Sequence, residues 1–169
     1  TSYIKTEGTT VTRNADVVGG AGDVSTFNSE EGVLYLNCKA LSLTNAVSRE
    51  INISDGTNNN RVLLAFTASG KIQGAYIGGS LVSANINISH DVTEFTEVVF
   101  SWKLNEFRLY ANGIEIGSDS LGSVTTPNVF NTLHLSSFTG AQTMFYGKTK
   151  ALKVYKSIAD AQADLPYIN

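Results

Sequence analysis

The side chains of this sequence that could perform acid–base chemistry begin with its carboxylates. The nearest acidic pairs are Glu30 with Glu31 and Glu94 with Glu97. Both pairs fall at expected loop or strand-edge positions, where carboxylates are usually solvated surface groups. We therefore expect neither pair to act as a catalytic dyad.

Nucleophilic chemistry has equally few candidates. His90 and His134 are far apart in the sequence, and each lies beside serine, although Asp91 follows His90. No G-x-S-x-G motif frames a serine nucleophile. The sequence alone leaves a triad open but gives no support for one. The single cysteine, Cys38, lies in an apolar run and is expected to pack as a small hydrophobe.

A metal site has one candidate segment, DGTNNN at residues 55–60. Asp55, Asn58 and Asn60 offer oxygen ligands and faintly resemble a calcium loop. The spacing does not match an EF-hand, which also requires a bidentate glutamate at its end. A plain hairpin turn explains the segment better. We expect no cofactor, with calcium at Asp55 retained as the alternative.

Ligand binding has a stronger candidate in a tyrosine among charged side chains. An exposed Tyr110 beside Arg108 would present a ring for stacking and a guanidinium fork for hydroxyls or carboxylates. A solvated sheet face explains the same residues, and this alternative stays open. The candidate ligand-binding residues are Tyr110, Arg108, Lys103, Glu115, Asn58, Asn60 and Tyr76.

The orientation of Tyr110 depends on a predicted meander of three strands within residues 98–120. Asn112-Gly113 is a strong signal for a two-residue type I′ turn, because both residues accept positive φ. Pairing then runs outward from this turn. The expected partners are Ala111 with Ile114, Tyr110 with Glu115, Leu109 with Ile116, and Arg108 with Gly117.

A second two-residue turn is expected at Asn105-Glu106. It pairs Trp102 with Leu109 and keeps one face of the meander apolar across all three strands. The parity that buries Trp102 against a second sheet turns Tyr110 outward. The expected apolar face is Val98, Phe100, Trp102, Leu104, Phe107, Leu109, Ala111, Ile114 and Ile116.

Short strand-like runs recur along the rest of the chain, separated by Gly, Asn, Asp and Ser. A short helix is expected at residues 157–165, with Ser157 as its N-cap. The pattern predicts an all-β, two-sheet antiparallel jelly-roll sandwich with a short C-terminal helix. The other expected strands are 9–13, 33–41, 49–54, 61–68, 71–77, 83–89, 132–137 and 145–156.

The 169 residues fit one domain, 1–169, which is long enough to bury its own core. The net charge of −3 and the scattered basic residues argue against a nucleic-acid partner. No apolar run reaches the roughly 18 residues of a membrane span. The chain begins at Thr1 without methionine, so we expect it to be a C-terminal piece of a longer protein.

Four segments, in this order along the chain, resemble a known family. They are TSYIKTEGTTVTRNADV, SDGTNNNRVLL, YANGIEIGSDS and FYGKTKALKVY. Together they resemble the concanavalin A-like lectin/glucanase superfamily, in its laminin-G-like branch. They are similar in particular to the laminin-G-like domains of bacteriophage tail fibre and virion structural proteins.

This resemblance implies a non-catalytic module that binds a glycan or a host cell-surface receptor, on a virion or extracellular protein. Trimers are common among fibre proteins, so it also raises a homo-oligomer as an expectation. Glucanases of the superfamily carry an E-x-D-x-x-E type motif, which the sequence lacks. The alternatives are a structural or oligomerisation domain without a ligand, and a polysaccharide-degrading enzyme domain.

Overall fold

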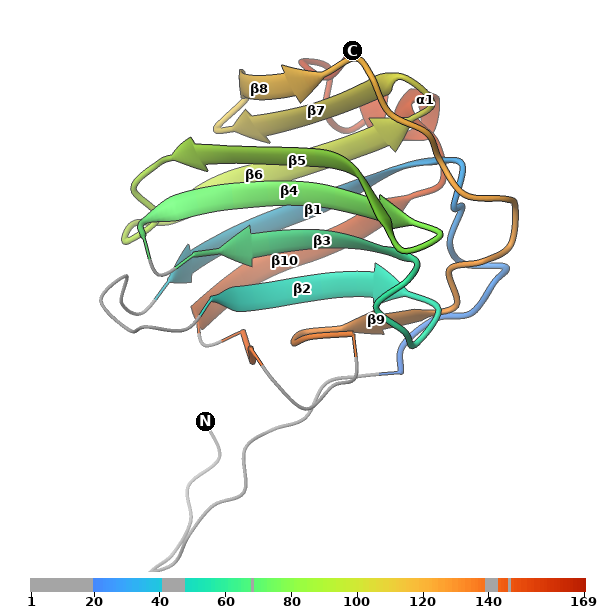
Figure 1. Cartoon of the computed structure of the whole chain (residues 1–169). Coiled ribbons are helices and arrows are strands. Elements are labelled where there is room, and N and C mark those ends of the chain that lie inside the picture. The colour runs from blue at the N-terminus through green and yellow to red at the C-terminus, as the bar shows by residue number, and fades with distance from the viewer. Residues whose placement is uncertain (1–19, 41–47, 68, 139–142, 146) are drawn as a thin grey trace, which may run out of the picture.

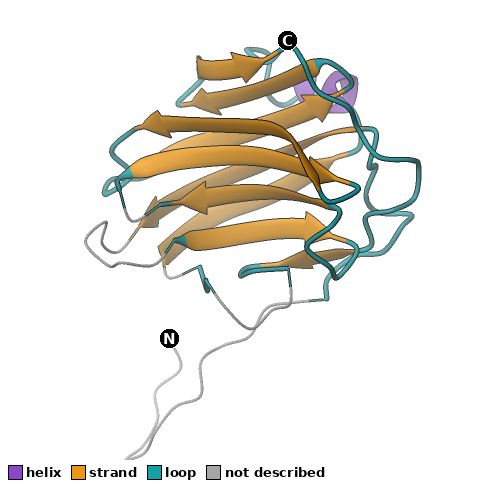
Figure 2. Cartoon of the chain, in the orientation of Figure 1, coloured by secondary structure: helices purple, strands orange, loops and turns teal. Residues whose placement is uncertain are grey.

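Two five-stranded antiparallel sheets pack face to face in the computed structural model of the chain (Figures 1 and 2). The structure describes residues 20–40, 48–67, 69–138, 143–145 and 147–169. The predicted all-β sandwich is therefore confirmed, while the strand expected at 9–13 lies outside the described residues. The helix α1 (Ile158–Gln162) follows the last strand.

The first sheet has the strand order β10-β1-β6-β7-β8, and the second has the order β5-β4-β3-β2-β9. The strands of the first sheet are β1 (Glu31–Ala40), β6 (Thr96–Lys103), β7 (Glu106–Ala111), β8 (Ile114–Asp119) and β10 (Gly147–Tyr155). Those of the second sheet are β2 (Arg49–Ser54), β3 (Arg61–Phe66), β4 (Lys71–Gly78), β5 (Leu81–Ser89) and β9 (Thr132–His134).

The main core lies between the two sheets and is built by alternate residues of each strand. Leu34, Phe100 and Trp102 of the first sheet belong to the same buried cluster as Ile51 and Leu64 of the second sheet, and all five are 0% exposed. Alternation places every second side chain of a strand on the same face. The predicted burial of Trp102 is confirmed.

The turn between β7 and β8 lies at Asn112-Gly113, as predicted. Both residues have positive φ, 50° and 79°. Tyr110 pairs with Glu115 as expected, but a bulge follows, and Leu109 pairs with Gly117 instead of Ile116. A bulge adds one residue to one strand and so moves every later pair. The expected burial of Ile114 is wrong, because this side chain is 68% exposed.

The turn between β6 and β7 lies one residue earlier than predicted, at Leu104-Asn105. Asn105 adopts a φ of 57°, a left-handed conformation that asparagine tolerates well. Trp102 therefore pairs with Phe107 and not with Leu109. Because the register moves by two residues, each of these strand residues keeps its expected face. Leu104, expected in the core, is in the turn and 58% exposed.

The outer face of the first sheet carries a second apolar cluster under α1 and the C-terminal segment. Ser157 caps the helix by accepting a hydrogen bond from the Asp160 backbone N–H, and Ile158 and Ala161 point inward. Leu165 and Ile168 extend the cover beyond the helix. The predicted helix is confirmed in place but is shorter than expected. No helix within the described ranges is long and apolar enough to span a membrane.

The outer face of the second sheet is different, because no described helix lies over it. In Figure 1 strands β5, β4, β3 and β2 face the viewer, in front of the first sheet, and α1 lies on the other side of the molecule. We call this surface of β5-β4-β3-β2-β9 the open face because no described helix covers it, although residues 136–138 lie over its β2–β3 side.

Candidate functional site

Tyr110 is buried, which corrects the expectation that it is exposed. Its side chain is 1% exposed and packs in the outer cluster with Val99 and Ile168. Its hydroxyl accepts a hydrogen bond from the backbone N–H of Asn169 at 3.2 Å, and its ring lies 6.1 Å from that of Tyr167. Burial raises the pKa of Tyr110. The alternation of side chains along β7 does point Tyr110 away from the main core, but the C-terminal segment covers the outer face of the first sheet, where Tyr110 lies.

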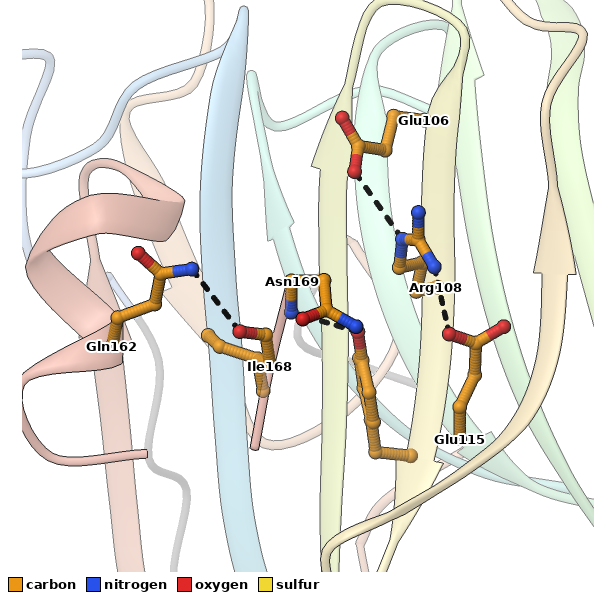
Figure 3. Close-up of polar contacts among 7 residues, drawn as sticks. Glu106, Arg108, Glu115, Gln162, Ile168 and Asn169 are labelled. Carbon is orange, nitrogen blue, oxygen red and sulfur yellow. Dashed lines mark hydrogen bonds and ion pairs between the residues drawn. The ribbon is translucent and has the colours of Figure 1, made fainter. Parts of the chain in front are cut away.

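The charged residues expected around Tyr110 are present but are engaged with one another (Figure 3). Arg108 donates to Glu115 at 2.8 Å and to Glu106 at 3.2 Å. The hydrogen bond from Arg108 to Glu115 is the main cause of the raised pKa of Arg108. Lys103 forms an ion pair with Glu31 at 3.4 Å. With Tyr110 covered, this group lacks the stacking ring on which its predicted role depended.

Tyr76 is also out of reach of a ligand. It is 0% exposed in the main core, and its ring lies 5.6 Å from Phe107. Its hydroxyl donates to the Ser29 carbonyl at 2.7 Å and accepts from the Thr125 N–H at 2.9 Å. Burial raises the pKa of Tyr76 to about 12. Tyr76 thus joins two loops to the core.

The loop at residues 55–60 is a hairpin turn between β2 and β3 that closes on itself. One oxygen of Asp55 accepts bonds from the Thr57 N–H and hydroxyl, and the other accepts from the Asn60 amide at 2.7 Å. Burial raises the pKa of Asp55, but the hydrogen bonds to its carboxylate lower the pKa by more, so the net shift is downward. Asn60 also accepts from the Gly79 N–H, whereas Asn58 is exposed. Calcium at Asp55 stays a prediction.

A small hollow lies where β7 begins and β8 ends. Its volume of about 80 Å³ is well below the roughly 300–1,000 Å³ of ligand pockets. The hollow is therefore too small to be a ligand pocket by itself. Its lining residues are Asn105, Glu106, Phe107, Arg108, Ser118, Asp119 and Ser120.

The open face brings together polar side chains that the sequence did not single out. Its base is a small apolar cluster, Leu63, Ala65, Ala75 and Ile77, between 1% and 7% exposed. Longer polar side chains from neighbouring strands surround this base. One row of paired residues crosses all five strands, and consists of His134, Asn52, Leu63, Ala75 and Asn85.

An ion pair lies on the β2–β3 side of the open face. Arg61 is 3.6 Å from the Glu50 carboxylate, and their side chains are 18% and 16% exposed. Asn52, fully buried, donates to Glu50 at 3.0 Å and accepts from Arg61 at 3.4 Å. The guanidinium also lies over the ring of Phe138, 5.2 Å from its centroid. Burial lowers the pKa of Arg61, and the Glu50 charge opposes this shift.

Uncharged amides lie on the β4–β5 side. Gln73 donates to the Asn85 side chain at 2.8 Å and pairs across the strands with Asn87. Asn85 and Asn87 are exposed. Each amide offers two donor hydrogens and an acceptor oxygen. This side of the face therefore carries several side-chain donors and acceptors, and the pairing of β4 with β5 fixes the positions of their backbones.

The third polar group is on the edge strand β9, beside the ion pair. His134 lies 3.3 Å from the Thr132 hydroxyl through its Nε2 atom, and its buried Nδ1 atom has no hydrogen-bond partner. Burial lowers the pKa of His134 below its ordinary value of 6.5, so the imidazole is neutral at pH 7. A neutral imidazole adds a donor or acceptor without adding charge.

Catalytic groups are sparse among the described residues. Glu50 is the one carboxylate on the described part of the open face, and Arg61 already pairs with it. No group of three or more His, Cys, Asp or Glu within the described ranges could hold a metal ion. Cys38 is fully buried in the core, as expected, and burial raises the pKa of its thiol to about 12.

The comparison with protein families decides the affiliation of the chain. A laminin-G family model, described as the Concanavalin A-like lectin/glucanases superfamily, matches residues 39–162. The chain belongs to this superfamily. The resemblance of the sequence segments is confirmed at this level. No curated protein matches the chain.

Several solved structures have a fold similar to that of this chain. The CBM40 module of the Ruminococcus gnavus IT-sialidase, bound to α2,3-sialyllactose, has a TM-score of 0.63 at 14% identity, over 89% of this chain and 95% of that one. A heptameric SAP-like pentraxin from Limulus polyphemus has a TM-score of 0.57 at 14% identity, over 80% of this chain and 67% of that one. The Bacillus licheniformis β-glucanase has a TM-score of 0.54 at 14% identity, over 77% of this chain and 68% of that one. At such identities the likeness shows the fold alone.

Proposed function

We propose that the domain is a non-catalytic carbohydrate-binding module whose open face contacts the glycan. The observation that carries the proposal is the group of uncharged amides on β4 and β5. Asn85 and Asn87 are exposed, and the partly exposed Gln73 donates to Asn85. Sugars present hydroxyls that these amides can recognise as donors and acceptors. The strand hydrogen bonds of β4 and β5 hold Gln73, Asn85 and Asn87 in position before a ligand arrives.

The fold supports this proposal, since a CBM40 module bound to α2,3-sialyllactose has a similar structure. We further propose that the parent is a virion or extracellular protein, such as a phage tail fibre, that binds a glycan or receptor on a host cell and assembles as a homo-oligomer, such as a trimer. The support for this context is the resemblance of the four sequence segments.

An enzymatic function has one observation in its favour, the fold shared with a β-glucanase. Retaining glycosidases need two carboxyl groups about 5–5.5 Å apart. The described part of the open face offers Glu50 alone, and this carboxylate is held by Arg61 and Asn52. Binding therefore fits the open face better than hydrolysis.

A structural role is favoured by a different observation, the exposed aliphatic side chains Leu104, Leu121 and Leu81. They are 58%, 84% and 72% exposed. Leu104 and Leu121 precede Asn105 and Gly122, whose backbones share a 2.8 Å hydrogen bond, so these two side chains start from neighbouring segments. Neighbouring exposed apolar side chains can form a contact with another protein. Under this second candidate the domain would associate with other subunits and bind no glycan.

A glycan array followed by calorimetry on the best ligand tests the proposal. Asn85→Ala with Asn87→Ala should weaken binding at least about tenfold, since it removes two amides from the face. Both side chains are exposed, so the melting temperature should barely change. Arg108→Ala, on the first sheet, is the matched control and should bind normally. Loss of binding in the control alone would move the site to the first sheet, and silence on the whole array would contradict carbohydrate binding.

A further inference from the structure

We propose that the open face selects neutral glycans over carboxylate-bearing ones, because Arg61, the cation at the start of its middle strand, is already paired with its own glutamate. This inference rests on the proposed carbohydrate binding and adds the chemical class of the ligand. It also separates this domain from its structural neighbour, which holds a sialylated sugar.

The ion pair of Arg61 and Glu50 is built into the sheet. The two residues lie on adjacent strands, β3 and β2, and Arg61 NH1 is 3.6 Å from Glu50 Oε2. Asn52 bridges them and is itself fixed by a 2.7 Å bond to the Ser136 carbonyl. Phe138 covers one face of the guanidinium. Arg61 Nε has no hydrogen-bond partner but is buried, so a ligand carboxylate would meet the Glu50 carboxylate and the Phe138 ring at the guanidinium.

The polar groups on β4 and on the two edge strands, β5 and β9, carry no charge near Arg61. Gln73, Asn85 and Asn87 are amides, and His134 is neutral at pH 7 because burial lowers its pKa. Lys71 is on the same face but lies two residues before Gln73 on β4, about 7 Å along the strand. The part of the face around Arg61 and His134 therefore offers hydroxyl-binding groups and no unpaired cation among the described residues, whereas Lys71 lies on the β4–β5 side.

A carboxylate placed near Arg61 would meet two penalties. It would approach the negative charge of Glu50, and it would lose water without gaining a free cation. A neutral hydroxyl in the same place meets neither penalty, since it can donate to Glu50 or accept from a guanidinium hydrogen. The pairing of Arg61 with Glu50 therefore lowers the affinity of this part of the face for acidic sugars relative to neutral ones.

Matched glycan pairs that differ only by a sialic acid test this inference, with lactose and α2,3-sialyllactose as one such pair on the array. We expect the neutral member to bind about tenfold more tightly, or more, in every pair that binds. Tighter binding of the sialylated members would overturn the selectivity and leave carbohydrate binding intact. Silence for all pairs would overturn the proposed function and this inference with it.

Glu50→Gln tests the cause of the selectivity. The glutamine keeps a carbonyl oxygen for Arg61 and Asn52 but removes the charge, so Arg61 becomes an unpaired cation. We expect the sialylated members to gain about tenfold in affinity relative to the neutral ones. Thermal melting confirms that the variant is folded. An unchanged ratio in a folded variant would refute the role of Glu50, and if the variant does not fold, the wild-type pairs decide the inference alone.

Discussion

Replacing Tyr110 by alanine tests whether the C-terminal segment covers the first sheet. The ring is 1% exposed, packs in the outer cluster with Val99 and Ile168, and lies 6.1 Å from the ring of Tyr167. If this face were open to solvent, the substitution would change the stability by no more than about 0.5 kcal/mol. The covered arrangement predicts a much larger loss.

The size of the loss follows from two contributions. Truncation of a buried aromatic ring to alanine costs about 3–5 kcal/mol, which includes the cavity that remains. The hydroxyl adds one hydrogen bond, from the Asn169 N–H at 3.2 Å, worth about 1 kcal/mol. Tyr110→Phe removes only this second contribution. The two variants together separate ring packing from the hydrogen bond.

Urea unfolding followed by circular dichroism measures both variants. With a slope of about 1–3 kcal/mol per molar urea, Tyr110→Ala should lower the midpoint by at least about 1 M, and Tyr110→Phe by less. The control is Arg108→Ala on the same strand, whose side chain is partly exposed. Equal midpoints for Tyr110→Ala and the wild type would refute the cover of this face by the C-terminal segment.

Three further substitutions test other parts of the structure. Trp102→Ala should cost about 3–5 kcal/mol in urea unfolding, and the native indole should resist acrylamide quenching; strong quenching would contradict its burial. Gly74→Ala should cost about 1–3 kcal/mol, because the added methyl group would overlap the Phe100 ring; an unchanged midpoint would show that the core has room there. Burial lowers the pKa of His134, so on acidification the unfolded chain takes up a proton before the folded chain does, and the folded state loses stability. The melting temperature of the wild type should therefore fall as the pH drops below about 6.5, and His134→Gln should make this fall smaller. An equal pH dependence in this variant would contradict the buried, neutral imidazole.

Local sequence determined most of the strands and the main core. The Asn112-Gly113 turn is specified by two residues that accept positive φ, so the pairing next to it could be predicted. The parity of β6 and β7 buried Trp102 even though the turn at Leu104-Asn105 lies one residue earlier than expected. A two-residue change of register preserves the faces, which made this prediction robust.

Only the tertiary structure decided which outer face the helix and the C-terminal segment cover. Alternation shows that Tyr110 points away from the main core, but it carries no information on whether a distant C-terminal segment covers that side. The open face was also hidden, because Leu63 and Ala65 on the outer side of β3 make that strand read as continuously apolar. Glu50, Asn85 and His134 come from three strands that are far apart in the sequence. They share one surface because the strand order β5-β4-β3-β2-β9 places them there, and strand order depends on contacts that no local pattern specifies.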